Sequence, residues 1–152
     1  MEQRISLMDT PKGYMDGLMK VGYFLNTSAI DKKLLHLIEF RVSQINGCAF
    51  CLDMHYKDAR HIGETEQRLY SLPSWPESPF YTDAEKAALR FAEELTIKCT
   101  TEDDTYEALT KHFTTEEISV LALSVAMLNC WNRLNKAFLT TPGTYKVGSF
   151  TA

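Results

Sequence analysis

Residues 36–63 read HLIEFRVSQINGCAFCLDMHYKDARHIG, and the rest of the chain is organised around this stretch. A helix is expected to begin near Gly47, because Asn-Gly breaks the segment before it. On that helix Cys48, Cys51 and His55 share one face, since residues three and four apart are helical neighbours. Two thiols and an imidazole on adjacent turns are typical of a dithiol redox site. We therefore interpret this stretch as the functional centre and the other helices as its scaffold.

The segment before the cysteines predicts another helix, capped at Ser28 or Asp31. Its apolar positions surround most of the helix: Leu34, Leu35, Leu37, Ile38, Val42 and Ile45. A helix that is apolar on most sides is buried on most sides. His36 and Glu39 are then polar groups on a buried element, where a lack of partners would be costly. We therefore expect both to be paired or functional.

The alternation of Ile38, Phe40 and Val42 also fits a strand, and a strand followed by C-x-x-C at a helix start is the thioredoxin arrangement. The preceding residues, DKKLLHL, favour a helix. No set of strand patterns elsewhere in the sequence would complete a sheet. We therefore predict a helix here, with the thioredoxin-like strand as the alternative.

Start signals mark three further helix boundaries. Asn46 is a candidate N-cap for the cysteine helix. Thr82 with Glu85 forms a capping box. Thr114 with Glu117 forms a second one, ahead of a long apolar helix.

The whole pattern predicts an all-α fold of about seven helices. We expect a single domain over residues 1–152, with its core motif region at residues 31–95. The segment SLPSWPESPFYT is the main linker, because its three prolines exclude a regular helix. The other helices are expected over residues 13–26 and 64–72, after Thr101, and from Thr114 to about Leu139.

The charge balance excludes some classes of partner. The net charge is −4 with a pI near 5.6, and no basic patch favours nucleic acid or a membrane surface. The longest apolar stretch, residues 118–131, is too short to cross a bilayer. The N-terminus has acidic residues and no apolar run, so we do not expect a signal peptide. We therefore expect a cytoplasmic protein, where a C-x-x-C pair is more often catalytic or metal-binding than structural.

The two cysteines are predicted to have different roles. Both lie near the first turn of a helix, where free N–H groups and the helix dipole favour a thiolate. His55 follows Cys51 by one turn and Cys48 by two, so it can take a proton from Cys51 or stabilise its thiolate. Cys51 is therefore predicted to attack, and Cys48 to resolve the oxidised sulfur as a disulfide.

Such a pair is suited to reducing a small organic hydroperoxide. The Cys51 thiolate would displace alkoxide from the O–O bond, become a sulfenic acid and condense with Cys48. The alkoxide needs a proton, for which His36 and Glu39 on the preceding helix are the available donors. A dithiol reductant protein or a small thiol would then reduce the disulfide by exchange, and no bound cofactor is needed.

Other interpretations of the cluster stay open. The cysteines could be small core residues, with His55 satisfied in the interior. A structural zinc site would use both cysteines, His55 and a fourth ligand, although C-x2-C-x3-H on one helix is not a common zinc-finger spacing. The candidates for that fourth ligand are His36, Glu39 and His61. The pair could also form a redox sensor, in which the disulfide changes the oligomeric state.

Two observations concern the rest of the chain. Cys99 and Cys130 lie in apolar helical contexts without neighbouring partners, so we expect inert core residues. The last long helix carries more apolar surface than one protomer needs, which favours a homo-oligomer.

One long part of the chain consists of RVSQINGCAFCLDMHYKDAR, then GETEQRLYSLPSW, a capped helix and WNRL. This part resembles the AhpD-like alkylhydroperoxidases of the carboxymuconolactone decarboxylase superfamily. The likeness covers residues 10–140, and its C-x-x-C-x-x-x-H segment is specific. The resemblance implies an all-α fold, trimers or hexamers, and peroxidase activity through the cysteine pair. In that family the second cysteine is peroxidatic and the first resolves, which carries onto Cys51 and Cys48. The family histidine carries onto His55.

Two positions depart from the family pattern. Family members usually have a glutamate twelve residues before the first cysteine, where this chain has His36. Glu39, one turn further on, is the candidate substitute as proton donor. Better-characterised hydroperoxidases also have a histidine between the cysteines, where this chain has Phe50. A weak peroxidase or a general dithiol redox protein is therefore the alternative, whereas decarboxylase activity is not expected because those relatives generally lack the cysteine pair.

Overall fold

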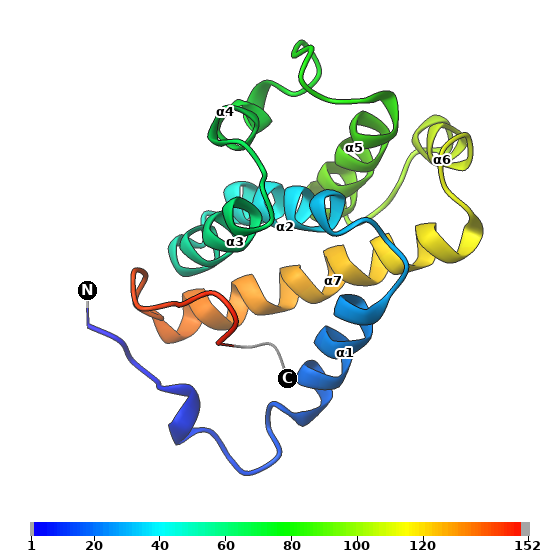
Figure 1. Ribbon diagram of the computed structural model, residues 1–152. Coiled ribbons are helices and arrows are strands. Elements are labelled where there is room, and N and C mark those ends of the chain that lie inside the picture. Colours follow the sequence, from blue (N-terminus) through cyan, green and yellow to red (C-terminus); the bar gives the residue numbers. More distant parts are fainter. Residues whose placement is uncertain (1, 150–152) are drawn as a thin grey trace.

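The computed structural model describes residues 2–149, which form seven α-helices and two 3₁₀ helices without a strand (Figure 1). The elements are η1 (Leu7–Asp9), α1 (Asp16–Thr27), α2 (Lys32–Asn46), α3 (Ala49–His61), α4 (Glu66–Ser71), η2 (Leu72–Ser74), α5 (Asp83–Lys98), α6 (Asp103–Thr110) and α7 (Thr115–Phe138). The all-α prediction is confirmed. The strand alternative is wrong, because Ile38, Phe40 and Val42 lie within α2.

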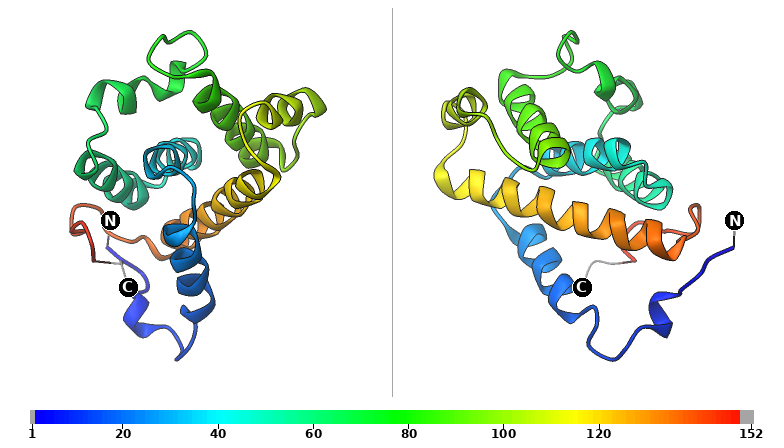
Figure 2. Two further views of the ribbon diagram at one scale, coloured as in Figure 1. Left: turned by 45° about the vertical axis from the view of Figure 1, so that its right-hand side comes forward. Right: turned by 180° about the vertical axis from the view of Figure 1, so that it is seen from behind.

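The central element is α2, which packs against α3, α5 and α7 (Figures 1 and 2). This surrounding explains its apolar circumference: Leu37, Ile38 and Val42 are completely buried. Burial of each such side chain contributes about 1.5–3 kcal/mol relative to exposure. The longest helix, α7, also contacts α1 and α5. No helix within residues 2–149 is long and apolar enough to cross a membrane.

The helix starts follow the local sequence. At both Thr82 and Thr114, the threonine hydroxyl accepts the N–H three residues ahead, and the glutamate there accepts the threonine N–H. Both predicted capping boxes are therefore confirmed. The carboxylate of Asp31 accepts two backbone N–H groups, so Asp31 rather than Ser28 caps α2. A cap of this kind contributes about 1 kcal/mol.

The junction between α2 and α3 differs from the prediction. Asn46 is the last residue of α2, and Gly47 turns into the left-handed region (φ 61°), where a side chain would cause strain. This turn moves the N-cap of α3 to Cys48, whose Sγ accepts the backbone N–H of Cys51. The Asn46 side chain instead donates to two asparagines of α7, at 3.0 and 2.8 Å.

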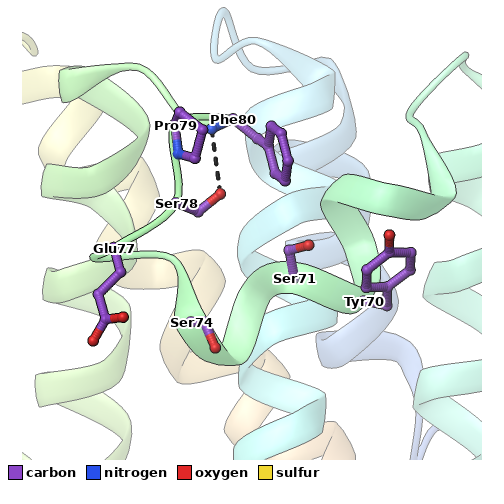
Figure 3. Close-up of a pocket in the computed structure, with 7 residues that line it drawn as sticks. All are labelled: Tyr70, Ser71, Ser74, Glu77, Ser78, Pro79 and Phe80. Carbon is purple, nitrogen blue, oxygen red and sulfur yellow. Dashed lines mark hydrogen bonds between the residues drawn. The ribbon is translucent and has the colours of Figure 1, made fainter.

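The proline-rich linker covers one side of α2 and α3. Its Trp75 and Tyr81 are buried in an apolar cluster with residues of both helices. Arg68 of α4 ties the linker to α5, because it binds the Phe80 carbonyl and the carboxylate of Glu85. An open pocket of about 370 Å³ lies along the linker (Figure 3). It is lined by Tyr70, Ser71, Ser74, Glu77, Ser78, Pro79 and Phe80, none of which is a predicted site residue.

The C-terminal tail, residues 140–149, is irregular and is fastened to α3. The hydroxyl of buried Tyr145 donates to Asp58 Oδ1 at 2.7 Å. The Gly143 N–H donates to Asp53 Oδ2 at 2.9 Å. Residues 143–145 are thus held against the helix that carries the cysteines.

Candidate active site

Both cysteines lie in the first turn of α3. The Cα atoms of Cys48 and Cys51 are 5.3 Å apart, and their sulfurs form a disulfide. Cys48 Sγ also accepts the Cys51 N–H at 3.4 Å. The exposed fractions of the two residues are 1% and 0%. The pair is therefore placed for a two-electron dithiol cycle and is closed to solvent when oxidised.

A chain of three titratable groups runs from the next turn of α3 to α2. Glu39 Oε2 lies 2.9 Å from His36 Nδ1 and 3.3 Å from His55 Nδ1. The His55 side chain is 6% exposed, whereas that of His36 is 19% exposed. The chain therefore leads from the interior toward solvent, with Glu39 at its centre. The packing of α2 on α3 brings all five predicted residues into one region, while their catalytic roles remain predictions.

The electrostatics of this chain favour an ionised carboxylate. Burial alone would raise the pKa of Glu39, but the attraction of His55 and the hydrogen bond from His36 outweigh it and lower this pKa to about 2. Burial alone would lower the pKa of His36, but the hydrogen bond and charge of Glu39 raise it above its usual 6.5. Glu39 is therefore a fixed negative charge between two imidazoles at neutral pH.

His55 is the least satisfied group of the site. Its Nδ1 lies at ion-pair distance from Glu39, but the two groups are not aligned as a hydrogen bond. Neither ring nitrogen has a hydrogen-bond partner among residues 2–149. A buried imidazole with unused nitrogens is expected to have a function, because unpaired polar groups are costly in an interior. Its position one turn after Cys51 suits proton exchange with a bound substrate or with that sulfur.

A third element, α7, contributes a group that the sequence interpretation did not include. Asn135 Nδ2 lies 3.6 Å from Cys51 Sγ. Asn129, Asn132 and Asn135 recur every three residues along α7. This spacing places the three asparagines along one side of α7. It is the feature of the sequence from which a polar contact of α7 with the site could have been predicted.

The tail closes the site. Tyr145 packs with both cysteines in a small apolar cluster, together with Phe50 and half-buried Met54. The tyrosine is 8% exposed and is anchored to α3 through Asp58. Phe50, which stands between the cysteines, therefore contributes to an apolar cover.

The structure also bears on metal binding. One atom each from His36, Glu39 and His55 lie within 4.8 Å of one another, so this trio could supply three ligands to a divalent cation. The zinc set predicted from the sequence differs, because it needs Cys48 and Cys51 as thiolates, whereas their sulfurs are joined here.

The other two cysteines lie apart from the disulfide. Cys130 is half-buried on α7. Cys99 is exposed, so the expectation of a core residue is wrong for it. The reason is local: α5 ends at Lys98, and Cys99 turns the chain away in the left-handed conformation (φ 57°).

Comparisons with known proteins agree with this fold. The model of the carboxymuconolactone decarboxylase family matches residues 8–94. The uncharacterised protein YdfG of Bacillus subtilis (strain 168) is 40% identical over 139 residues, which cover 90% of this chain and 95% of YdfG. ATU0492 from Agrobacterium tumefaciens is a protein of unknown function proposed to be the antioxidant defence protein AhpD. Its crystal structure has a TM-score of 0.89 and 34% identity, over 95% of this chain and 100% of that one.

An uncharacterised peroxidase-related protein from Silicibacter sp. TM1040 shares the fold alone. Its TM-score is 0.76 at 23% identity, over 90% of this chain and 73% of that one. Together, the seven-helix fold and the disulfide-bonded C-x-x-C pair define an AhpD-like protein. The chain belongs to the carboxymuconolactone decarboxylase family.

Proposed function

We propose that the protein is a thiol-dependent peroxidase that reduces small organic hydroperoxides through a Cys48–Cys51 dithiol/disulfide cycle. One observation carries the proposal: the joined sulfurs lie one turn from a buried His55, which contacts an ionised Glu39. A peroxide-reducing dithiol needs this combination, namely a thiolate, a resolving thiol and a proton source for the leaving alkoxide.

The first step oxidises Cys51. Its thiolate attacks the terminal oxygen of the hydroperoxide, the O–O bond breaks, and the sulfur becomes a sulfenic acid while alkoxide leaves. A proton from His55 converts the alkoxide to the alcohol. The Glu39 carboxylate lies 3.3 Å from His55 Nδ1 and 2.9 Å from His36 Nδ1, so the half-buried His36 connects the carboxylate to solvent protons.

The second step closes the disulfide. The Cys48 thiolate attacks the sulfenic sulfur, an S–S bond forms, and hydroxide leaves and is protonated to water. The Cα separation of 5.3 Å allows this bond without movement of the helix. A partner dithiol protein or a small thiol then reduces the pair by exchange and is itself oxidised. We expect the cycle to run in the reducing cytoplasm, in a homo-oligomer of three or six subunits.

Glu39 is the candidate substitute for the glutamate that family members have at the position of His36. It stands one turn after His36, yet its carboxylate reaches both histidines. We infer that Glu39 takes the role of the relay carboxylate and that His36 extends the relay outward.

A general dithiol redox protein or redox sensor is the second candidate. The complete burial of both sulfurs favours it, because a covered disulfide meets substrate only after the tail moves. Turnover separates the two, since a sensor is oxidised by peroxide without sustained consumption.

The test is thiol counting on protein in which exposed Cys99 is replaced by serine. One equivalent of cumene hydroperoxide is expected to remove two thiols, and a dithiol reductant is expected to restore them. Cys51→Ser should abolish the first consumption of peroxide, whereas Cys48→Ser should allow one consumption and stop turnover. Loss of the first consumption in Cys48→Ser alone would reverse the two roles. Unchanged thiols after peroxide would refute the proposal.

A further inference from the structure

The side of α7 that faces α2 and α3 carries three asparagine side chains, and their amides have different hydrogen-bond partners. Asn129 donates to the Thr96 hydroxyl at 3.1 Å and to a backbone carbonyl of its own helix. Asn132 donates to the Ser43 hydroxyl at 3.3 Å and accepts from Asn46 at 2.8 Å. These two amides join helices to one another. Asn135 instead meets a sulfur of the disulfide.

The orientation of the Asn135 amide is fixed by its second contact. Nδ2 donates to the Trp131 carbonyl at 3.0 Å, a contact that the amide oxygen could not make because it has no hydrogen to donate. An amide nitrogen carries two hydrogens, so the other one points to Cys51 Sγ at 3.6 Å. Asn135 is 7% exposed and Cys51 is fully buried, so water does not compete for this hydrogen bond.

We propose that Asn135 is a catalytic residue whose amide N–H stabilises the Cys51 thiolate. This inference rests on the proposed function and adds a group from α7 to it. A donor that meets a neutral sulfur in the disulfide meets a charged one after reduction, and hydrogen bonds to ionised groups are the stronger ones. Low local polarity strengthens such a bond further.

The amide also distinguishes the two sulfurs. Cys48 is the N-cap of α3, so its sulfur already has a backbone N–H and the positive end of the helix. The helix start alone therefore favours the Cys48 thiolate as much as the Cys51 thiolate. Asn135 gives Cys51 a donor of its own, which supports its role as the attacking thiol.

The titratable and charged groups around Cys51 come from several elements. Tyr145 of the tail packs against Cys51, and its hydroxyl binds Asp58 of α3. The other groups on the elements that carry or pack against α3 are His55 on α3, His36 and Glu39 on α2, and Lys136 on α7. Substitution of Asn135 by an uncharged residue leaves every one of these charges in place. An effect on Cys51 can then be assigned to the lost hydrogen bond.

The experiment measures the pKa of Cys51 directly. In protein carrying Cys48→Ser, Cys99→Ser and Cys130→Ser, the remaining thiol is titrated by the ultraviolet absorbance of its thiolate, which needs no reagent to enter the covered site. Asn135→Leu removes the donor at similar volume and is expected to raise the Cys51 pKa by about one unit, a tenfold loss of thiolate below that pKa.

Two more variants make the comparison specific. Asn135→Asp keeps the shape but adds a negative charge, so it should raise the Cys51 pKa further than leucine does. Asn129→Leu is the matched control, with the same change on the same helix at an amide that does not touch the sulfur, and it should leave this pKa unchanged. Should Asn135→Leu fail to fold, Asn135→Ala removes the same donor with less bulk.

A wild-type Cys51 pKa in the Asn135 variants, or an equal rise in Asn129→Leu, would overturn the assignment of Asn135. These outcomes are separate from the test of the proposed function. A protein that shows the expected rise but turns over no hydroperoxide keeps Asn135 as the thiolate donor and loses the peroxidase proposal. Normal turnover of hydroperoxide with an unchanged Cys51 pKa in the Asn135 variants would support the peroxidase proposal and overturn the assignment of Asn135.

Discussion

Replacement of Glu39 by glutamine is expected to destabilise the protein in a particular pH window. The glutamine keeps the size of the side chain and can still bind His36, but it removes the negative charge between two imidazoles. A fall in the Glu39 pKa from 4.5 to about 2 corresponds to about 3 kcal/mol of folding free energy, at about 1.4 kcal/mol per pKa unit. The carboxylate is 16% exposed, so solvent screens this interaction little.

The two ends of the window follow from the two directions of pKa change. The Glu39 pKa is lowered on folding, so its contribution is complete above pH 4.5 and is lost as the pH falls toward 2. The His36 pKa is raised on folding, so its contribution is complete below pH 6.5 and is lost as the pH rises through the folded-state pKa. The difference between wild type and Glu39→Gln should therefore be greatest between pH 4.5 and 6.5.

Urea unfolding across this range measures the difference. Near pH 6 the variant should lose about 3 kcal/mol, or about 6–12 °C in Tm for a chain of this size. Glu107→Gln on exposed α6 is the matched control and should change stability by less than about 0.5 kcal/mol. A difference below about 1 kcal/mol, or one that stays constant across the pH range, would refute the ion-pair account of the Glu39 pKa.

Three further predictions concern the cover, a helix cap and the inter-helix amides. Tyr145→Ala should speed reduction of the disulfide by a small dithiol about 10- to 150-fold, because about 1.5–3 kcal/mol of apolar burial holds the tail closed. Thiol release over time measures this rate, and an unchanged rate would contradict the role of Tyr145 as a cover. Thr114→Ala should cost about 1 kcal/mol in urea unfolding without affecting that rate. Asn46→Ala should lower the free energy of unfolding in urea by about 1–3 kcal/mol, since it leaves the Asn132 oxygen buried and unpaired. An unchanged free energy of unfolding would show that water replaces the lost donor.

The sequence predicted the features that depend on neighbours along the chain. The capping boxes at Thr82 and Thr114 involve residues three apart, and the alignment of Cys51 with His55 involves residues four apart. The apolar circumference of α2 also marked a central helix correctly. Local spacing determines such features because the helix repeats every 3.6 residues.

The missed features depend on backbone detail or on distant contacts. One left-handed residue, Gly47, moved the N-cap from Asn46 to Cys48, and a composition pattern does not specify that dihedral angle. Asn135 reaches Cys51 across 84 positions, so only the packing of α7 on the earlier helices brings the two together. The same holds for Tyr145, which meets α3 from the tail.

The order of synthesis gives this arrangement a consequence for the newly made chain. Asn135 leaves the ribosome 84 residues after Cys51, and Tyr145 leaves ten residues later still. At about 5–20 residues per second, Cys51 therefore spends about 4–17 seconds outside the ribosome before Asn135 emerges, and about 5–19 seconds before Tyr145 does. A nascent chain in this interval presents two accessible thiols, so the fold acquires its covered cysteine pair only once Asn135 and Tyr145 have been made.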